Sequence, residues 1–254
     1  MKIGTEREAE VLIVTIDRPE CRNAIDSEAA SMLREAFEQF ERDESASVAV
    51  LTGAGGTFCS GWDLKSLAGG EPDYDPEGPG ALGPTRTLPG KPVIAAVEGH
   101  AVAGGLELAL WCDLRIASET AIFGVYCRRW GVPLIDGGTV RLPRLVGQGR
   151  ALDMILTGRP VGAQEALNWG LADRLVPAGR ALETAVSLAQ EIARFPASCM
   201  RADRMSAYRQ WDLSLEEALR EEARGGEAPL RQGARDGAAR FAGGLGRAGR
   251  FDEI

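Results

Sequence analysis

The segment HAVAGGLELALWCD, residues 100–113, places one carboxylate, Glu107, inside an otherwise apolar run. If a helix begins near Gly104, its first N–H groups have no partner within the helix, and the helix dipole adds positive potential there. Residues three apart lie on one face of a helix, so Glu107 would lie beside an oxygen bound by the Gly104 N–H. The spacing therefore predicts an oxyanion site with an acid next to it.

Two interpretations of Glu107 follow from these residues alone. A carboxyl group in a partly dehydrated pocket tends toward a raised pKa, which suits proton transfer near neutral pH. Alternatively, the carboxylate accepts N–H groups in the first turn of its own helix. The spacing favours neither.

A second glycine-rich segment is GAGGTFCSGWDL, residues 53–64. Its spacing differs from that of dinucleotide and phosphate loops, because Phe58 stands where a third small residue is needed and no Lys-Ser/Thr follows. Gly61 would let the backbone of Ser60–Trp62 come close to a ligand, so an N–H there could donate to it. The alternative is a flexible turn.

The elements that must position these residues follow an α/β pattern. A helix capped by Asp26 or Ser27 should run to about Arg42 with an apolar stripe. From about Arg150 the spacing is mostly helical. Apolar, often β-branched runs predict buried strands at 11–16, 48–53, 93–99 and within 114–125. The Gly- and Pro-rich stretch 69–90 is expected to be a surface loop.

Composition excludes several classes of function. With 29 basic and 37 acidic residues the 254-residue chain carries a net charge of −8, which argues against nucleic acid or an anionic membrane as the partner. The five scattered cysteines form no CxxC pair, and His100 is the single histidine, so we expect no metal site. The charged N-terminus and the absence of an apolar run of about 20 residues predict a cytoplasmic protein.

Several long motifs follow one another through most of the chain. They are IDRPECRNAID (16–26), FCSGWDLK (58–65), KPVIAAVEGHAVAGGLELALWCDLRIAS (91–118), FGVYCRRWGVPLIDGGTVRLPRLVG (123–147) and LTGRPVGAQEALNWGLADRLVP (156–177). These motifs resemble the enoyl-CoA hydratase/isomerase (crotonase) superfamily. The resemblance implies an α/β fold in which ββα units wind into a spiral over residues 1–195. It implies that residues 196–254 form a helical region used for trimerisation. The expected assembly is a homotrimer or a dimer of trimers.

The resemblance also implies an acyl-CoA thioester as substrate and no further cofactor. The N–H groups of Trp62 and Gly104 would hold the thioester oxygen and stabilise an enolate. The residues implied to contact the substrate or its CoA are Arg22, Ala24, Ser60, Asp63, Leu64, His100 and Val132. A hydrogen-bonded packing role is the alternative for His100, and the Trp62 indole either shapes the acyl pocket or belongs to the core.

The sequence departs from the family at the second acid. Hydratases of this family use two glutamates; one matches Glu107, whereas Cys127 stands where the other is expected. A thiol, whose pKa is ordinarily about 8.5, replaces a carboxylic acid poorly, so Cys127 is better interpreted as a packed apolar residue. Asp136 matches a place where some isomerases, dehalogenases and decarboxylases of the superfamily have a working aspartate. Alternatively, it forms a turn or caps a helix near Thr139.

The function expected from these features is enoyl-CoA hydration, the reversible addition of water to a 2-enoyl thioester. Glu107 would position or deprotonate the water, and Asp136, or less readily Cys127, would handle the second proton. Because the second glutamate is missing, an enoyl-CoA isomerase or another enolate reaction is an alternative. A non-catalytic acyl-CoA-binding protein is a third. Arg128 and Arg129 would pair with CoA phosphates, with Asp136 or with surface acids.

Overall fold

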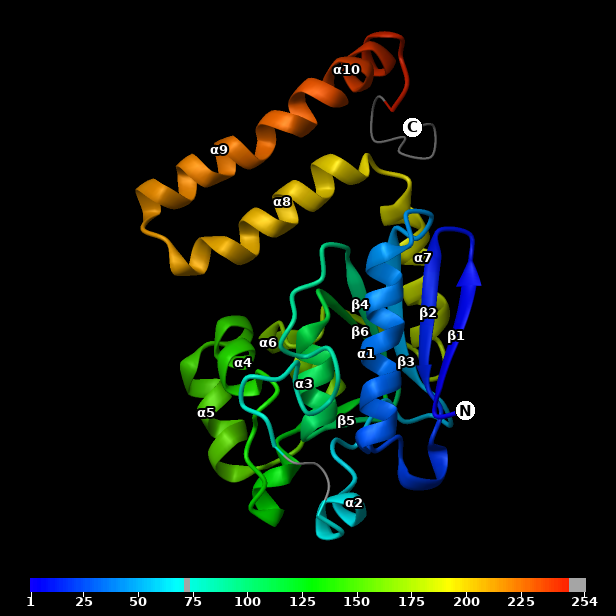
Figure 1. The fold of residues 1–254 in the computed structure, drawn as a ribbon, viewed down its shortest axis with the longest axis vertical. Helices are drawn as coiled ribbons and strands as arrows, with labels where there is room; N and C mark the ends of the chain where they lie inside the picture. Colours follow the sequence, from blue (N-terminus) through cyan, green and yellow to red (C-terminus); the bar gives the residue numbers. More distant parts are fainter. Residues whose placement is uncertain (71–73, 247–254) are drawn as a thin grey trace. The chain divides into compact units, whose positions relative to one another are not determined.

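The structure is a computed structural model that describes residues 1–70 and 74–246 (Figure 1). Predictions that fall on residues 71–73 and 247–254 lie outside the described residues. By its internal contacts the chain divides into two units, Met1–Ala189 and Gln190–Ile254, and each is described by itself.

The first unit is built on a six-stranded sheet with the order β1-β2-β3-β4-β6-β9. β1 pairs with β2 antiparallel, and all other neighbours are parallel. The strands are β1 (Ile3–Glu8), β2 (Val11–Ile16), β3 (Val48–Gly53), β4 (Val93–Val97), β6 (Leu114–Ser118) and β9 (Arg174–Val176). The runs predicted as buried strands are confirmed. β1 was not predicted because most of its side chains are polar and exposed, as an edge strand permits.

A smaller sheet contains β5 (His100–Val102), β7 (Ile122–Gly124) and β8 (Val161–Gly162), in that order. The pairs β4–β5 and β6–β7 each place one strand in the large sheet and the next in the small one. The helix α3 (Gly104–Trp111) then follows β5 directly. This confirms the predicted ββα repeat and the helix that was expected to begin near Gly104.

The remaining helices of the first unit surround these sheets (Figure 1). α1 (Ser27–Arg42) is capped by Asp26, whose carboxylate accepts the Ala29 N–H, and it buries Leu33, Phe37 and Phe40. The others are α2 (Leu64–Ala68), α4 (Gly138–Val146), α5 (Gln148–Thr157), α6 (Ala163–Trp169) and α7 (Ala181–Ala193), with 3-10 turns at Pro19–Cys21 and Tyr126–Trp130. The N-cap of α4 is Gly137, so the alternative in which Asp136 caps this helix was wrong.

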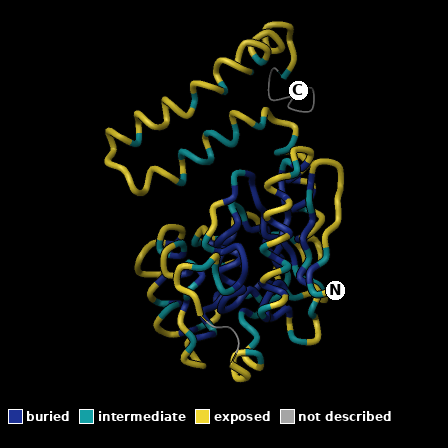
Figure 2. Tube along the Cα trace, in the orientation of Figure 1, coloured by how far each residue is buried: buried dark blue, intermediate teal, exposed yellow. Residues whose placement is uncertain are grey.

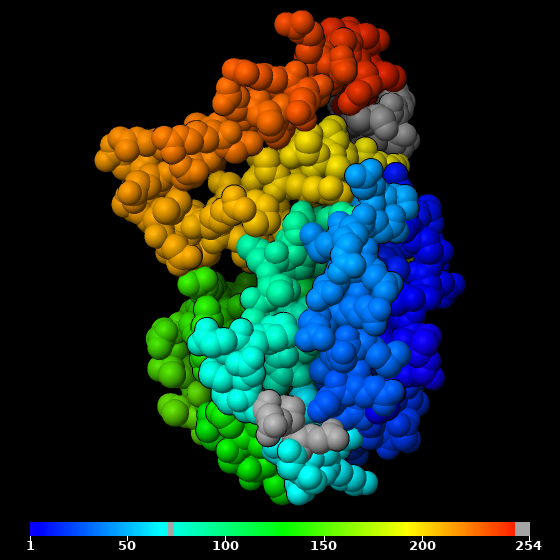
Figure 3. Space-filling view, in the orientation of Figure 1, coloured from blue at the N-terminus to red at the C-terminus, as the bar shows by residue number. Residues whose placement is uncertain are grey.

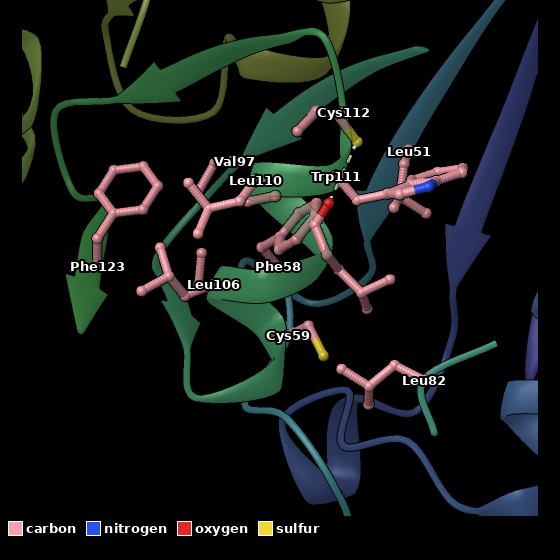
Figure 4. Close-up of a cluster of buried hydrophobic side chains, with 14 of the residues drawn as sticks. Leu51, Phe58, Cys59, Leu82, Val97, Leu106, Leu110, Trp111, Cys112 and Phe123 are labelled. Carbon is pink, nitrogen blue, oxygen red and sulfur yellow. Dashed lines mark hydrogen bonds between the residues drawn. The ribbon is translucent and has the colours of Figure 1, made fainter. Parts of the chain in front are cut away.

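The buried side chains concentrate in the strands and in α3 (Figure 2). All eight residues of α3 are buried, Glu107 among them. Leu106, Leu110 and Trp111 of this helix lie in the same cluster as Phe58 and Leu82 (Figure 4). Because α3 is enclosed on all sides, the position of its first turn is fixed by the core.

The stretch predicted as a surface loop is only partly exposed. Residues 82–85 are buried. The segment that continues to Gly90 runs beside α1, since the Gly90 N–H donates to Glu41 over 3.0 Å and a Cβ on Gly83 would lie 2.6 Å from the Ala30 oxygen. Figure 3 shows the two as one continuous surface. The expectation was wrong here because the polar groups of this stretch are satisfied by partners inside the protein.

In its described part the second unit holds the end of α7 and the helices α8 (Ala197–Arg209), α9 (Leu215–Gln232) and α10 (Ala234–Ala242), which confirms the predicted helical C-terminal region. α9 begins with a capping box between Ser214 and Glu217. None of the described residues of these three helices is buried, and Leu215, Leu219 and Leu230 are 77, 58 and 70% exposed. Within the described residues, no helix combines the length and the apolar character needed to cross a bilayer.

Candidate functional site

A cavity of about 760 Å³ opens in the first unit at the N-terminal end of α3. Every residue that the sequence predicted for the site lies in its wall. These are Arg22, Ala24, Ser60, Trp62, Asp63, Leu64, His100, Gly104, Glu107, Cys127, Val132 and Asp136. The structure therefore brings together residues from four separate parts of the chain, 22–24, 60–64, 100–107 and 127–136.

The N–H groups of Trp62 and Gly104 are close neighbours. Gly61 lies against the start of α3, because a Cβ placed on it would be 2.8 Å from the Gly104 nitrogen. Ala103 has φ 53° and ψ −125°, a backbone conformation that turns the chain sharply from β5 into α3. Among the described residues, neither the Trp62 nor the Gly104 N–H donates to a backbone oxygen. Two unpaired donors at a helix N-terminus form a binding site for an oxygen that carries negative charge.

Glu107 lies one turn into α3 and is 2% exposed. Its Oε1 accepts the N–H groups of Asp136 and Gly138, over 2.9 and 2.8 Å. Among the described residues it accepts no N–H from its own first turn, so the capping interpretation was wrong. Burial raises the pKa of Glu107 to about 7, and the nearby Asp136 charge adds to this effect, although the two N–H groups oppose it. Glu107 is thus suited to exchange a proton near neutral pH.

Asp136 lies in the turn before α4 and is also 2% exposed. Its Oδ1 accepts the Leu82 N–H over 3.1 Å and the Thr85 hydroxyl. The Asp136 N–H binds Glu107, so the two acids are joined through one peptide group. The carboxylate does not cap α4, and it faces the same cavity as Glu107.

Cys127 is 6% exposed and lies in the 3-10 turn beside the cavity. Burial raises the pKa of its thiol, and the charge of Glu107 raises it further. A thiol that keeps its proton near neutral pH can neither accept one as a base nor deliver one readily as an acid. The packing interpretation of Cys127 is therefore the better supported one.

Replacing Cys127 with alanine should accordingly change kcat for the proposed reaction by less than about threefold, because the thiol carries no proton in turnover. Steady-state kinetics on the purified variant measures this. A loss of about 100-fold, in a variant that melts near the parent temperature, would make the thiol a catalytic group.

Arg22 and Ser60, two of the residues expected to contact the substrate or its CoA, lie together in the cavity wall. The Ser60 N–H donates to the Arg22 oxygen over 3.1 Å. Arg22 has φ 54°, a left-handed conformation that its neighbour Asn23 shares. Asp63 lines the same cavity, but its carboxylate already accepts the Lys65 N–H and pairs with Arg18 at 3.2 Å. These contacts give Asp63 a structural role, in addition to the expected contact with the substrate or its CoA.

Aromatic side chains also line the cavity. His100 lies 6.5 Å from the ring of Tyr126, centroid to centroid. The Trp62 indole packs against the core, and its buried N–H has no partner among the described residues. The sequence reasoning missed Tyr126 and Trp130 as lining residues. Their closeness to Cys127 in the chain was the only available signal.

Arg128 and Arg129 donate to the backbone oxygens of Ile155 and Gly158. Their pairing with CoA phosphates stays a prediction. The Arg129 guanidinium also lies 4.2 Å from the Tyr126 ring centre. Within residues 1–70 and 74–246, no group of His, Cys, Asp and Glu side chains has the arrangement needed to hold a metal ion.

Solved structures share the fold over nearly the whole chain. The enoyl-CoA hydratase from Mycobacterium tuberculosis H37Rv matches with a TM-score of 0.90 and 35% identity, covering 95% of this chain and 95% of that chain. A probable enoyl-CoA hydratase/isomerase from Mycobacterium abscessus matches with a TM-score of 0.87 and 37% identity, again covering 95% of each. The fold is therefore that of the crotonase class of proteins.

The sequence comparisons identify the family within that class. The family model described as enoyl-CoA hydratase/isomerase matches residues 6–243. The carnitinyl-CoA dehydratase of Proteus mirabilis is 40% identical over 213 residues, covering 83% of this chain and 81% of that protein. An enoyl-CoA hydratase of Mycobacterium tuberculosis is 42% identical over 195 residues, covering 74% and 73%. The chain belongs to the enoyl-CoA hydratase/isomerase family.

Proposed function

We propose that this protein is an acyl-CoA hydratase that adds water reversibly to a 2-enoyl-CoA to give a 3-hydroxyacyl-CoA. The observation that carries the proposal is the pair of buried acids, Glu107 and Asp136, beside the two unpaired N–H groups of Trp62 and Gly104. Its relatives include proteins named enoyl-CoA hydratase and carnitinyl-CoA dehydratase. No further cofactor is proposed, since the thioester itself activates the double bond.

In the proposed mechanism the thioester oxygen is bound by the Trp62 and Gly104 N–H groups. Attack of water on the β-carbon moves the electrons of the double bond onto this oxygen and forms an enolate. The two N–H groups stabilise the negative charge because they already point to where it develops. The enolate then collapses as the α-carbon takes up a proton.

The environments of the two acids support a division of roles. Asp136, whose Oδ1 accepts two donors, takes the proton of the attacking water as its oxygen bonds to the β-carbon. Glu107, whose pKa is raised to about 7 mainly by burial, gives its proton to the α-carbon. Return of the proton from Asp136 to Glu107 completes the cycle. This order differs from the expectation that Glu107 would handle the water.

The test is the loss of the conjugated enoyl-thioester absorbance when enzyme is added to short- and medium-chain 2-enoyl-CoAs. We expect turnover at catalytic enzyme concentrations, with the 3-hydroxyacyl-CoA as product. Absence of turnover even at enzyme concentrations near that of the substrate would exclude hydration as the main reaction. If calorimetry then showed acyl-CoA binding, the non-catalytic alternative would stand.

Replacing Asp136 with asparagine is expected to lower kcat for hydration by about 10²- to 10⁴-fold, because the amide cannot take the water proton. The fold should persist, since asparagine keeps an oxygen for the Leu82 N–H and the Thr85 hydroxyl. Steady-state kinetics measures the effect, and the melting temperature checks the fold. Retention of more than about a tenth of the parent rate would remove Asp136 from the mechanism.

One observation favours a second reaction of the same site. The neutral thiol of Cys127 replaces the second glutamate, so the pair of acids differs from that of typical family hydratases. A single base at Asp136 would suffice to move a proton between the α- and γ-carbons of an enoyl thioester, as an isomerase does. Activity that is lost on changing Asp136 but kept on changing Glu107 would support the isomerase.

For assembly we propose the homotrimer or dimer of trimers that the family resemblance implies. The support is the set of exposed leucines on α9, which a monomer would leave in water. We also propose a cytoplasmic location, because all five cysteines are free thiols, as is usual in a reducing compartment.

A further inference from the structure

The segment of residues 80–86 contacts both the start of α3, which carries the Gly104 N–H, and the Asp136 carboxylate. The Leu82 side chain lies against the start of α3, because a Cβ placed on Gly104 would be 2.5 Å from Leu82 Cδ1. Its backbone N–H donates to Asp136 Oδ1 over 3.1 Å, and the Thr85 hydroxyl donates to the same oxygen. The segment therefore fixes the second acid relative to the oxyanion donors.

The contact between Thr85 and Asp136 is enclosed on every side. The Thr85 side chain is fully buried. Gly80 has φ +117°, and a Cβ on it would lie 2.2 Å from the Thr85 hydroxyl oxygen, so only glycine leaves room for that hydroxyl. The Arg141 guanidinium donates to the backbone oxygens of Thr85 and Asp136, over 2.7 and 3.0 Å. Residues 80–86 and the turn that contains Asp136 are therefore held together by these contacts, and the hydrogen bond between Thr85 and Asp136 lies among them.

The charged and titratable groups around Asp136 come from several elements. Glu107 faces it from α3 and Arg141 from α4. Arg86 of its neighbouring segment donates to the Ile135 oxygen over 3.3 Å, and the Cys127 thiol lines the same cavity. Two acids this close resist being charged together. Among the described residues Glu107 accepts two backbone N–H groups, whereas Asp136 accepts one backbone N–H and one side-chain donor, the Thr85 hydroxyl. A donor on a carboxylate oxygen favours its charged form, so the Thr85 hydroxyl is the side-chain group that favours a charged Asp136.

We propose that Thr85 is a positioning residue that holds Asp136 as the charged member of the acid pair, and thereby leaves Glu107 as the member that carries the proton. The proposal rests on the proposed hydratase function for its kinetic consequence. Its structural part, the control of the Asp136 charge by the Thr85 hydroxyl, does not depend on which enolate reaction the site performs.

The kinetic test compares three variants. Thr85→Val removes the hydroxyl and keeps the shape, and we expect kcat near neutral pH to fall about tenfold while the acidic limb of the pH–rate profile moves to higher pH. Thr85→Ser restores the hydroxyl and should recover kcat to within about threefold of the parent. Thr87→Val is the matched control, because its hydroxyl donates to the Pro84 oxygen over 2.7 Å in the same segment.

The outcomes separate positioning from packing. A uniform loss of kcat at every pH in Thr85→Val, or a Thr85→Ser variant as poor as Thr85→Val, would overturn the proposal. In an Asp136→Asn background the further change Thr85→Val should have little added effect, because the group it positions is gone. Full additivity of the two losses would also overturn it.

A readout without turnover keeps this proposal distinct from the proposed function. In protein carrying carboxyl-¹³C aspartate, the Asp136 resonance is the one missing from the Asp136→Asn spectrum. Its chemical shift near neutral pH should change in Thr85→Val and stay near the parent value in Thr85→Ser and Thr87→Val. An unchanged chemical shift would refute the role of Thr85, whereas a changed one in a protein without hydratase activity would refute only the hydratase.

Discussion

Replacing Glu107 with glutamine is expected to lower kcat for hydration by about 10²- to 10⁴-fold, because the amide has no proton to give to the α-carbon. The substitution is nearly isosteric. In the parent protein the N–H groups of Asp136 and Gly138 donate to Glu107 Oε1 over 2.9 and 2.8 Å. The side-chain oxygen of glutamine can still accept both. The enoyl-thioester assay measures the loss. Glu119→Gln, on an exposed turn, is a control that should keep the parent rate.

The same substitution should change how stability depends on pH. Burial raises the Glu107 pKa from its ordinary value of 4.5 to about 7 in the folded protein. Between these values the folded protein holds a proton that the unfolded chain has lost, so the parent loses stability as pH rises through this range. Each pKa unit corresponds to about 1.4 kcal/mol, so the loss amounts to a few kcal/mol.

Chemical denaturation at pH 5 and pH 8 tests this second effect. Glu107→Gln cannot ionise, so it should lose less stability than the parent between the two values. A variant with low activity and a shallower stability profile supports a buried acid that works by carrying a proton. If parent and variant showed the same pH dependence, the raised pKa would be refuted even though the loss of activity stood.

Replacing Gly61 with alanine is expected to lower kcat by about 10²- to 10³-fold, the effect of disrupting an oxyanion donor. The new Cβ would lie 2.8 Å from the Gly104 nitrogen and 2.9 Å from the Ala103 Cβ. It would therefore push apart the two segments that carry the paired N–H groups. Both KM and kcat should be measured, since the loss should fall mainly on kcat.

Gly56→Ala provides the matched control for this prediction. Gly56 also has a positive φ, +74°, but nothing lies within 4 Å of a Cβ placed on it. Both substitutions place a side chain at positive φ, which strains the backbone, whereas only the change at Gly61 crowds the site. Equal losses of activity in the two variants would mean that strain, rather than the oxyanion donors, causes the effect.

Local patterns were enough to predict much of the fold. Buried strands such as β2 and β3 are continuous apolar runs, and α1 shows its cap at Asp26 and its apolar stripe directly. β1 escaped prediction because an edge strand needs few apolar residues. In the small sheet β7 lies within a predicted run, whereas β5 and β8 were not predicted, because strands of two or three residues carry too little pattern to be recognised.

In the candidate site, too, contacts between residues close together in the chain could be predicted, whereas contacts between distant residues could not. Glu107 and Gly104 are one turn apart, so their relation follows from helix geometry. The partners of Asp136 do not, since Thr85 is 51 residues away along the chain. A threonine in a stretch rich in glycine and proline gives no local sign that its hydroxyl will meet a buried carboxylate. Only the path of the chain from α1 to β4 brings the two together.

The helices α8, α9 and α10 bury none of their described side chains within a single chain. α8 and α9 contact each other, but helices with little buried apolar surface are marginal in water, so further contacts would stabilise them. If copies of the chain supply them, mass action makes the folding of this region depend on protein concentration. Dilution would then melt these helices while the sheets persist. The measured stability of this region would therefore be lower in a dilute assay than at high protein concentration.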